Sequence, residues 1–165
     1  VIVDADAENA IVVAPGANSH LTLNSDAVRR LVTESGVVLM QLEIPVPTVL
    51  DAARLARQSG ATVMLNASPI PGAVALLAEV AQLADVLVLN EEEAAHWQWR
   101  VPHLVITRGA RGASYVGRDR SFDVSAPAVD AVDTTGAGDV FAGVLAASWR
   151  DGPDHAVRRA CTAAA

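Results

Sequence analysis

The sequence predicts an α/β fold in which a mostly parallel sheet carries helices on both faces. Strand-like and helical segments alternate between residues 37 and 107, a rhythm typical of parallel strands joined by crossover helices. The strand segments are nearly continuous apolar runs, as strands covered on both faces should be. The chain has 165 residues, 52% hydrophobic and 19% charged, which allows one domain with a sizeable core.

Turn and capping residues between the apolar runs place the elements. Ahead of the alternating part, the predicted elements are a hairpin of Val1–Val3 and Ile11–Val13 across polar residues 4–9, a turn at 15–18, and a helix from Ser25 or Asp26 to about Ser35. The alternating part comprises strand Val37–Gln41, helix Pro47–Ser59, strand Ala61–Leu65, helix Ala73–Leu83, strand Asp85–Leu89, helix Glu91–Trp97 and strand His103–Thr107. The remaining elements are an antiparallel extension of Tyr115–Val116 and Ser121–Val124, a helix Ala137–Arg150, and a helix from about Pro153 to the terminus.

Composition excludes several classes of function. The chain has twelve basic residues, all of them Arg, so it has neither the lysine of a Walker A loop nor one for a Schiff base. Its net charge of −7 argues against nucleic-acid partners, and no apolar run is long enough to span a membrane. A single cysteine, Cys161, excludes an internal disulfide and a multi-cysteine zinc site, and favours a soluble, cytoplasmic protein.

The segment Asp133–Asp139 is the most informative part of the sequence. Gly136, Ala137 and Gly138 open a helix of small residues, and first-turn amides without intrahelical partners favour bound anions such as phosphate. Asp139 lies beside them. A carboxylate there is either a favourable partner of the helix dipole or a base that removes a proton from a substrate hydroxyl.

Four motifs in order resemble the ribokinase-like (PfkB) family of carbohydrate kinases. They are Met40–Pro45, Leu89–Ala94 with an Asn-x-x-Glu pattern, Ile106–Gly112 with a Thr-x-Gly-x-x-Gly pattern, and Asp133–Asp139 followed by Phe141-Ala142-Gly143. The resemblance covers nearly the whole chain, as the middle and C-terminal part of a longer protein. It implies an ATP-dependent kinase, a phosphotransferase with an alcohol acceptor, that phosphorylates a primary hydroxyl of a sugar.

The resemblance also implies roles for individual residues. Asp139 would be the catalytic base, in contact with the substrate, and residues 136–138 the anion hole. Asn90 would lie near the nucleotide phosphates, and Glu93 would place Mg²⁺ through water, which suits an ion that keeps several waters. From spacing alone, Glu93 equally suits a solvated helix face.

Two more segments receive ligand-binding roles from the same resemblance. Thr107, Gly109 and Gly112 would contact the nucleotide, although the pattern also suits a simple turn. Glu43 would contact sugar hydroxyls, although a surface acid at a strand end is an equal reading. Asp133 and the carbonyl of Thr135 would hold K⁺; alternatively, Asp133 forms an Asx turn.

The sequence also departs from the family pattern. We expect a single ribokinase-like domain over residues 1–165 that is incomplete, because the strand-rich lid and the first strand–helix units are absent. Residues 94–102 connect two motifs that the family separates by a longer stretch, and the adenine- and cation-binding loop would follow residue 165. The lid pairs two subunits in such enzymes, so a homodimer is the expectation for the full-length form.

The resemblance favours ribose as the sugar, and leaves fructose, a sugar acid or a nucleoside as alternatives within the family. From a different class, a non-catalytic remnant that binds nucleotide is a further alternative. The intact Asp139 argues against the remnant.

Overall fold

The computed structural model describes residues 2–3, 9–10, 14, 16–70, 74–131 and 133–165. A six-stranded sheet organises this part of the chain, with its strands side by side in sequence order. The strands are β3 (Val37–Gln41), β4 (Thr62–Asn66), β5 (Val86–Asn90), β6 (His103–Thr107), β7 (Ala113–Val116) and β8 (Ser121–Val124). Neighbours from β3 to β6 are parallel, and β7 and β8 add antiparallel pairs. The predicted α/β class is confirmed.

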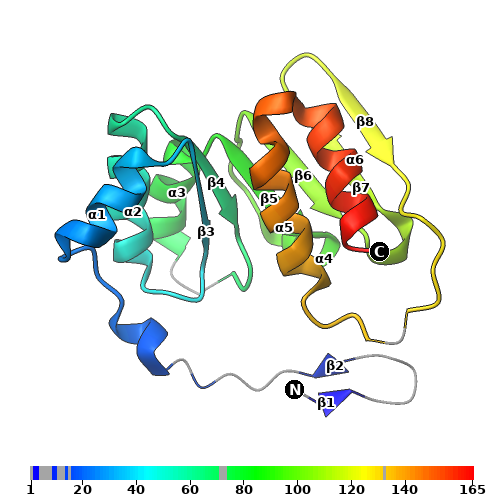
Figure 1. Ribbon diagram of the computed structural model, residues 1–165, viewed down its shortest axis with the longest axis horizontal. Helices are drawn as coiled ribbons and strands as arrows, with labels where there is room; N and C mark the ends of the chain where they lie inside the picture. Colours follow the sequence, from blue (N-terminus) through cyan, green and yellow to red (C-terminus); the bar gives the residue numbers. More distant parts are fainter. Residues whose placement is uncertain (1, 4–8, 11–13, 15, 71–73, 132) are drawn as a thin grey trace.

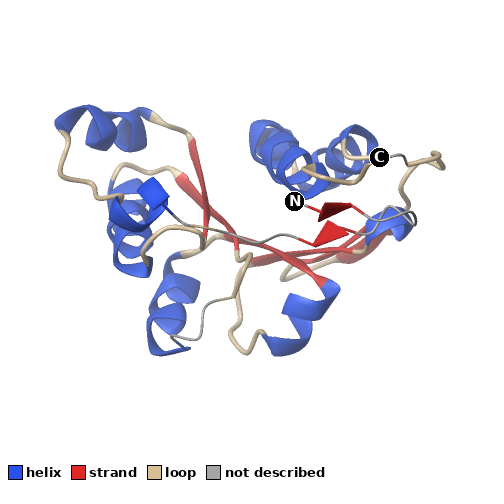
Figure 2. Cartoon of the chain, turned by 90° about the horizontal axis from the view of Figure 1, so that it is seen from below, coloured by secondary structure: helices blue, strands red, loops and turns tan. Residues whose placement is uncertain are grey.

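Helices cover both faces of the sheet (Figure 2). On one face, α2 (Val46–Gln58), α3 (Val74–Leu83) and α4 (Glu91–His96) connect the parallel strands, and α1 (Asp26–Glu34) packs on α2. On the other face, α5 (Ala137–Ser148) contacts β3, while α6 (Pro153–Ala163) contacts β7 and β8. Figure 1 shows α5 and α6 side by side across the sheet.

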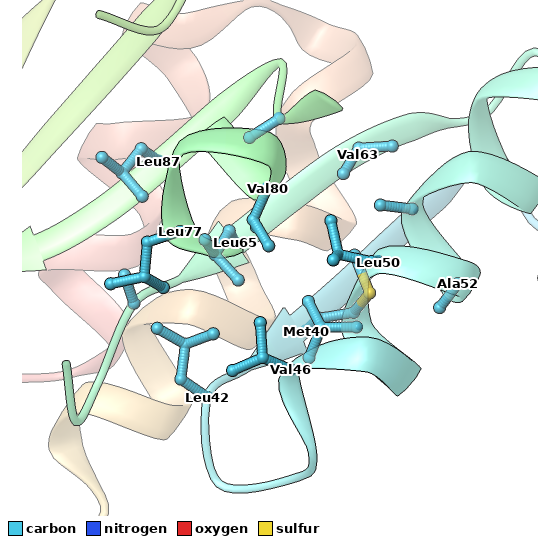
Figure 3. Close-up of a cluster of buried hydrophobic side chains, with 14 of the residues drawn as sticks. Met40, Leu42, Val46, Leu50, Ala52, Val63, Leu65, Leu77, Val80 and Leu87 are labelled. Atoms are coloured by element: carbon cyan, nitrogen blue, oxygen red, sulfur yellow. The ribbon is translucent and has the colours of Figure 1, made fainter. Parts of the chain in front are cut away.

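Alternation along the central strands builds two cores. Successive side chains of a strand point to opposite faces, so Val63 and Leu65 of β4 enter the core under α2 and α3, and Met64 enters the core under α5 and α6. Figure 3 shows the first core, where Leu65, Leu77 and Val80 lie together. Because both faces of β4 and β5 are buried, these strands need the uninterrupted apolar runs that the sequence contains.

The first residues and the helix ends differ from the prediction in detail. An antiparallel pair does form, but from β1 (Ile2–Val3) and β2 (Asn9–Ala10). The predicted second strand at 11–13 lies outside the described residues. A 3₁₀ helix, Gly16–His20, stands where a turn was predicted, and α5 ends at Ser148, where a 3₁₀ turn replaces its last residues.

Strand β3 also differs from the expectation of cover on both faces. It is the first strand of the described sheet and pairs only with β4 there. Of its residues only Met40 is buried, at 8% exposure. The apolar sequence of β3 therefore gave its position along the chain correctly but overstated its burial.

The connection between α4 and β6 closes in a few residues without breaking the sheet. The backbone N–H of Trp97 donates to Glu93 O at 3.0 Å, and its indole Nε1 donates to Trp99 O at 2.8 Å. The two rings meet edge to face, 5.0 Å apart, and pack against the first core. Both tryptophans thus serve packing, and β5 and β6 remain in parallel register.

Candidate active site

Polar residues end the parallel strands at one edge of the sheet. Gln41 of β3 is in register with Asn66 of β4, and Asn90 of β5 with Thr107 of β6. Ligands bind outside the carboxyl ends of the strands in open parallel sheets. The fold therefore gathers Gln41, Asn90 and Thr107, from three of the four recognised motifs, along one edge.

The start of α5 reaches the same edge. Gly136 is its N-cap, with φ of +80°, a left-handed conformation that glycine adopts without strain. The amide of Ala137 donates to Thr134 O at 3.1 Å, so one of the three expected anion-hole amides is already engaged. A Cβ on Gly136 or Gly138 would meet nothing within 4 Å, so the backbone there is open to a ligand.

Asp139 accepts a hydrogen bond from a residue that is distant in the sequence. Gln41 Nε2 donates to Asp139 Oδ1 at 2.9 Å, across 98 residues of sequence. Strand alternation explains the meeting, because Val37 and Leu39 face the core under α5, and Gln41 follows them at the same period. The sequence predicts no separate role for Gln41, and no local pattern signals such a distant partner.

Asn90 and Glu93 form a reciprocal capping box at the start of α4. Asn90 Oδ1 accepts the Glu93 N–H at 2.7 Å, and Glu93 Oε2 accepts the Asn90 N–H at 2.8 Å. The Glu93 carboxylate therefore has a structural role in the helix cap. Neither of the two expectations for Glu93, a metal-binding role or a solvated helix face, included this role. The pattern Asn-x-x-Glu is itself a capping-box signature, so the sequence did contain the signal.

The loop Thr107–Gly112 follows β6 directly. Thr107 Oγ1 donates to Leu89 O at 3.3 Å, which ties the loop to the end of β5. The two glycines differ in their surroundings. Gly109 has φ of +54° and open space where a Cβ would lie, whereas a Cβ on Gly112 would stand 2.0 Å from Val124 O. Gly112 is thus required by the close approach of β8, whatever its contact with a nucleotide.

Ion pairs fix the two arginines of this loop. Arg111 pairs with Glu91 at the start of α4, which joins the loop to the capping-box motif. Arg108 Nη2 lies 2.7 Å from Asp123 Oδ1, and Ser114 also donates to that carboxylate. The Ser114 hydroxyl, followed by the Arg108 charge, lowers the pKa of Asp123.

Asp133 and Thr135 form the turn that leads into α5. Asp133 Oδ1 accepts the Thr135 N–H at 2.8 Å, an Asx turn. Hydrogen bonds from the Thr135 hydroxyl and amide lower the pKa of Asp133, which keeps it an anion. Beside this turn lies a pocket of about 390 Å³, lined by residues 129–131, Asp133, Thr134, Ala137 and the end of the chain after α6.

The other expected ligand residue, Glu43, lies in the loop between β3 and α2 and is exposed. Among the described residues, no group of three or more His, Cys, Asp or Glu side chains is arranged to hold a metal ion. A second hollow, of about 460 Å³, is lined by residues of α5 and α6 that include Val144 and Arg158, but by none of the expected site residues. No helix in the part of the chain that the structure describes is long and apolar enough to cross a membrane.

Comparison with known proteins gives a consistent match. The model of the pfkB family of carbohydrate kinases matches residues 1–100 and 98–165, two segments that meet in the short connection after α4. The chain is 34% identical to the ribokinase of Haemophilus influenzae over 183 residues and 30% identical to that of Staphylococcus aureus over 176. These alignments cover 96% and 94% of this chain but only 58% and 57% of the relatives.

Solved structures agree with the sequence relatives. The ribokinase of Thermotoga maritima superposes with a TM-score of 0.81 at 29% identity, over 99% of this chain and 60% of that one. The ribokinase of Arabidopsis thaliana, solved with ribose and ATP, gives a TM-score of 0.82 at 26% identity, over 98% of this chain and 59% of that one. The chain thus spans somewhat more than half the length of these proteins.

Proposed function

Because this chain belongs to the pfkB family of carbohydrate kinases, we propose that the protein is an ATP-dependent sugar kinase. In the proposed reaction a primary hydroxyl oxygen of the sugar attacks the γ-phosphorus of ATP. A new P–O bond forms as the bond to the β-phosphate oxygen breaks and ADP leaves. Catalysis then depends on positioning and on stabilising negative charge, since the protein forms no covalent bond with the phosphoryl group.

One observation carries the proposal: Asp139 stands at the open start of α5 beside the carboxyl ends of the parallel strands. Gln41 engages Oδ1, and Oδ2 is the oxygen that would accept the proton of the sugar hydroxyl. Gly136 and Gly138 offer backbone to which no side chain blocks access. In the proposal these amides face the transferring phosphoryl group, where the helix dipole favours negative charge. The Ala137 amide joins them when it exchanges its bond to Thr134 O for one to the phosphoryl group.

The remaining ligand roles are assigned by motif within the same proposal. Asn90, Thr107, Gly109 and Gly112 form the nucleotide side, supported by their position along the edge shared by β5 and β6. The pocket beside Asp133 lies next to the first turn of α5, which suits an extended nucleotide. A cytoplasmic location belongs to the proposal as well, because the reaction consumes ATP.

Two cations are included in the proposal because carboxylates suit them. Glu93 uses Oε2 in the capping box, which leaves Oε1 for a water of Mg²⁺. The ion, when bound, would neutralise charge on the phosphate oxygens. Asp133 uses Oδ1 in its turn, and Oδ2 with the Thr135 carbonyl is the oxygen pair proposed for K⁺.

Ribose is the proposed sugar, with Glu43 in contact with its hydroxyls. Support comes from the named relatives, which include ribokinases at 30% to 34% identity. A panel of ribose, deoxyribose, fructose and nucleosides with coupled ADP detection tests this choice. Faster turnover of another member of the panel would overturn ribose and leave the kinase proposal intact.

The base assignment has a direct test in the whole protein. Asp139→Asn should lower turnover about 10²- to 10⁴-fold, which is the usual contribution of a general base. ATP binding, measured by calorimetry, should stay within about twofold. Asp119→Asn, at an exposed turn, is the matched control and should match the unchanged protein. Near-normal turnover of Asp139→Asn would refute the base.

A non-catalytic nucleotide-binding role is the second candidate, favoured by the family match in two segments that meet in the short connection. The same two assays separate it from the kinase. Calorimetric ATP binding with no sugar-dependent ADP release in the unchanged protein would establish the second role and reject the first.

A further inference from the structure

The hydrogen bond between Gln41 and Asp139 links the end of β3 to the start of α5, two elements that also pack on each other through the core. Gln41 is the last residue of β3, and Asp139 lies in the first turn of α5. Their side chains meet at 2.9 Å, which is within the usual range for a donor nitrogen and an oxygen acceptor. The contact therefore joins the end of a strand in the sheet to the helix layer that covers it.

We propose that Gln41 is a positioning residue for the base: its amide fixes the Asp139 carboxylate so that one defined oxygen faces the substrate hydroxyl. This inference rests on the proposed kinase function. A terminal carboxylate torsion is broad and roughly two-fold, so an unheld Asp139 at an exposed helix start samples many orientations. The donor on Gln41 selects one of them by engaging Oδ1.

The chemistry of the amide suits this task. A carboxamide NH₂ donates to a carboxylate while carrying no net charge. A cation at position 41 would pair with Asp139 more strongly and compete with the proton that the base must accept. A carboxylate there would repel Asp139. A neutral donor orients the base and leaves its charge available.

Backbone order supports the same assignment. Val37 and Leu39 pack in the core beneath α5, while Met40 faces the opposite core. Gln41 therefore cannot turn away from α5 without reversing the alternation of β3. Its own register with Asn66 on β4 anchors the strand end. The donor is thus presented by a paired strand, which holds position better than a loop does.

Gln41→Met tests the proposal, because methionine keeps the length of the side chain and removes the donor. In the whole protein we expect kcat to fall about 10- to 100-fold, as expected for a misplaced catalytic group, with KM for ATP and sugar and the melting temperature essentially unchanged. Gln82→Met, on the exposed face of α3, is the matched control and should retain full kcat. Gln41→Glu should lose at least as much kcat as Gln41→Met.

The outcomes separate this inference from the function on which it rests. If Asp139→Asn abolishes turnover but Gln41→Met keeps kcat within twofold, the base stands and the positioning role is refuted. If Gln41→Met and Gln41→Glu lower the melting temperature in step with kcat, the contact is structural and the proposal is also refuted. If Asp139→Asn retains turnover, the function itself fails.

Discussion

Substitutions of Glu93, in the capping box of α4, can separate the structural role of its carboxylate from the proposed metal-binding role. Glu93→Gln keeps an oxygen that can accept the Asn90 N–H, now bonded at 2.8 Å, and removes the charge. Glu93→Ala removes both. Neighbouring Glu92 is exposed, so Glu92→Gln and Glu92→Ala are matched controls for charge and for helix propensity.

The expected magnitudes follow from the two hydrogen bonds of the box. Loss of a capping side chain costs about 0.5 to 2 kcal/mol, and α4 lies at the surface, so Glu93→Ala should cost about 1 kcal/mol. Glu93→Gln should cost about 0.3 to 0.5 kcal/mol, the lower part of the range for loss of a charge near a helix N-terminus. Urea unfolding gives the global free energy, and hydrogen exchange reports α4 itself, whose amides should exchange about fivefold faster in Glu93→Ala.

Kinetics supply the second half of the test. If Glu93 also places Mg²⁺ in the proposed way, Glu93→Gln should keep its stability and still require several times more Mg²⁺ for half-maximal turnover. Equal destabilisation by Glu93→Gln and Glu93→Ala would refute the capping argument. An unchanged Mg²⁺ requirement in a stable Glu93→Gln protein would instead refute the metal role.

Two further predictions concern stability at positions away from Asp139. Gly112→Ala should destabilise the protein by at least about 2 kcal/mol more than Gly109→Ala does, as measured by urea unfolding. Both substitutions strain a positive φ, but only the new Cβ at position 112 would press against Val124 O. Equal costs would show that β8 moves aside. Burial lowers the pKa of His103 from its ordinary 6.5, against an opposing pull from Asp85, so the folded state binds fewer protons at this imidazole than the unfolded chain does. The free energy of unfolding should therefore fall as pH drops below about 6.5, and His103→Gln should flatten that fall between pH 7 and 5. An unchanged slope in His103→Gln would show that other groups cause the pH dependence.

The fold was accessible from the sequence because its signals are local. Apolar runs flanked by turn residues placed the parallel strands within one residue of their observed ends, and Gly60, with φ of +80°, marks the end of α2 as expected. Burial was less accessible, since it depends on neighbours that a single segment does not specify. The β3 run looks like an interior strand in composition, yet it stands first in the described sheet.

The residues of the candidate site could be predicted from the sequence only as a set of separate motifs. Each motif reports one segment, and the Asn-x-x-Glu pattern carried both a ligand-binding and a capping meaning, of which the capping one was overlooked. Contacts between motifs leave no local trace. The ion pair of Glu91 with Arg111 and the bond of Gln41 with Asp139 join residues 20 and 98 positions apart, and only the sheet order brings these partners together.

The sheet order also explains why the two halves of the candidate site are held by different means. On the proposed nucleotide side, Thr107 and Asn90 are neighbours in register on β6 and β5, so the pairing of two adjacent strands sets their spacing. Asp139 belongs to a helix, and its distance from the strands depends on packing between layers, which a small change in the core can alter. A side-chain bond from the strand to the helix removes that freedom at one point, where a shift of about 1 Å would cost most in rate. A substitution that loosens α5 on the sheet, such as Leu145→Ala in the second core, should therefore lower kcat more in Gln41→Met than in the unchanged protein, and equal factors in both would place the alignment of Asp139 in the packing alone.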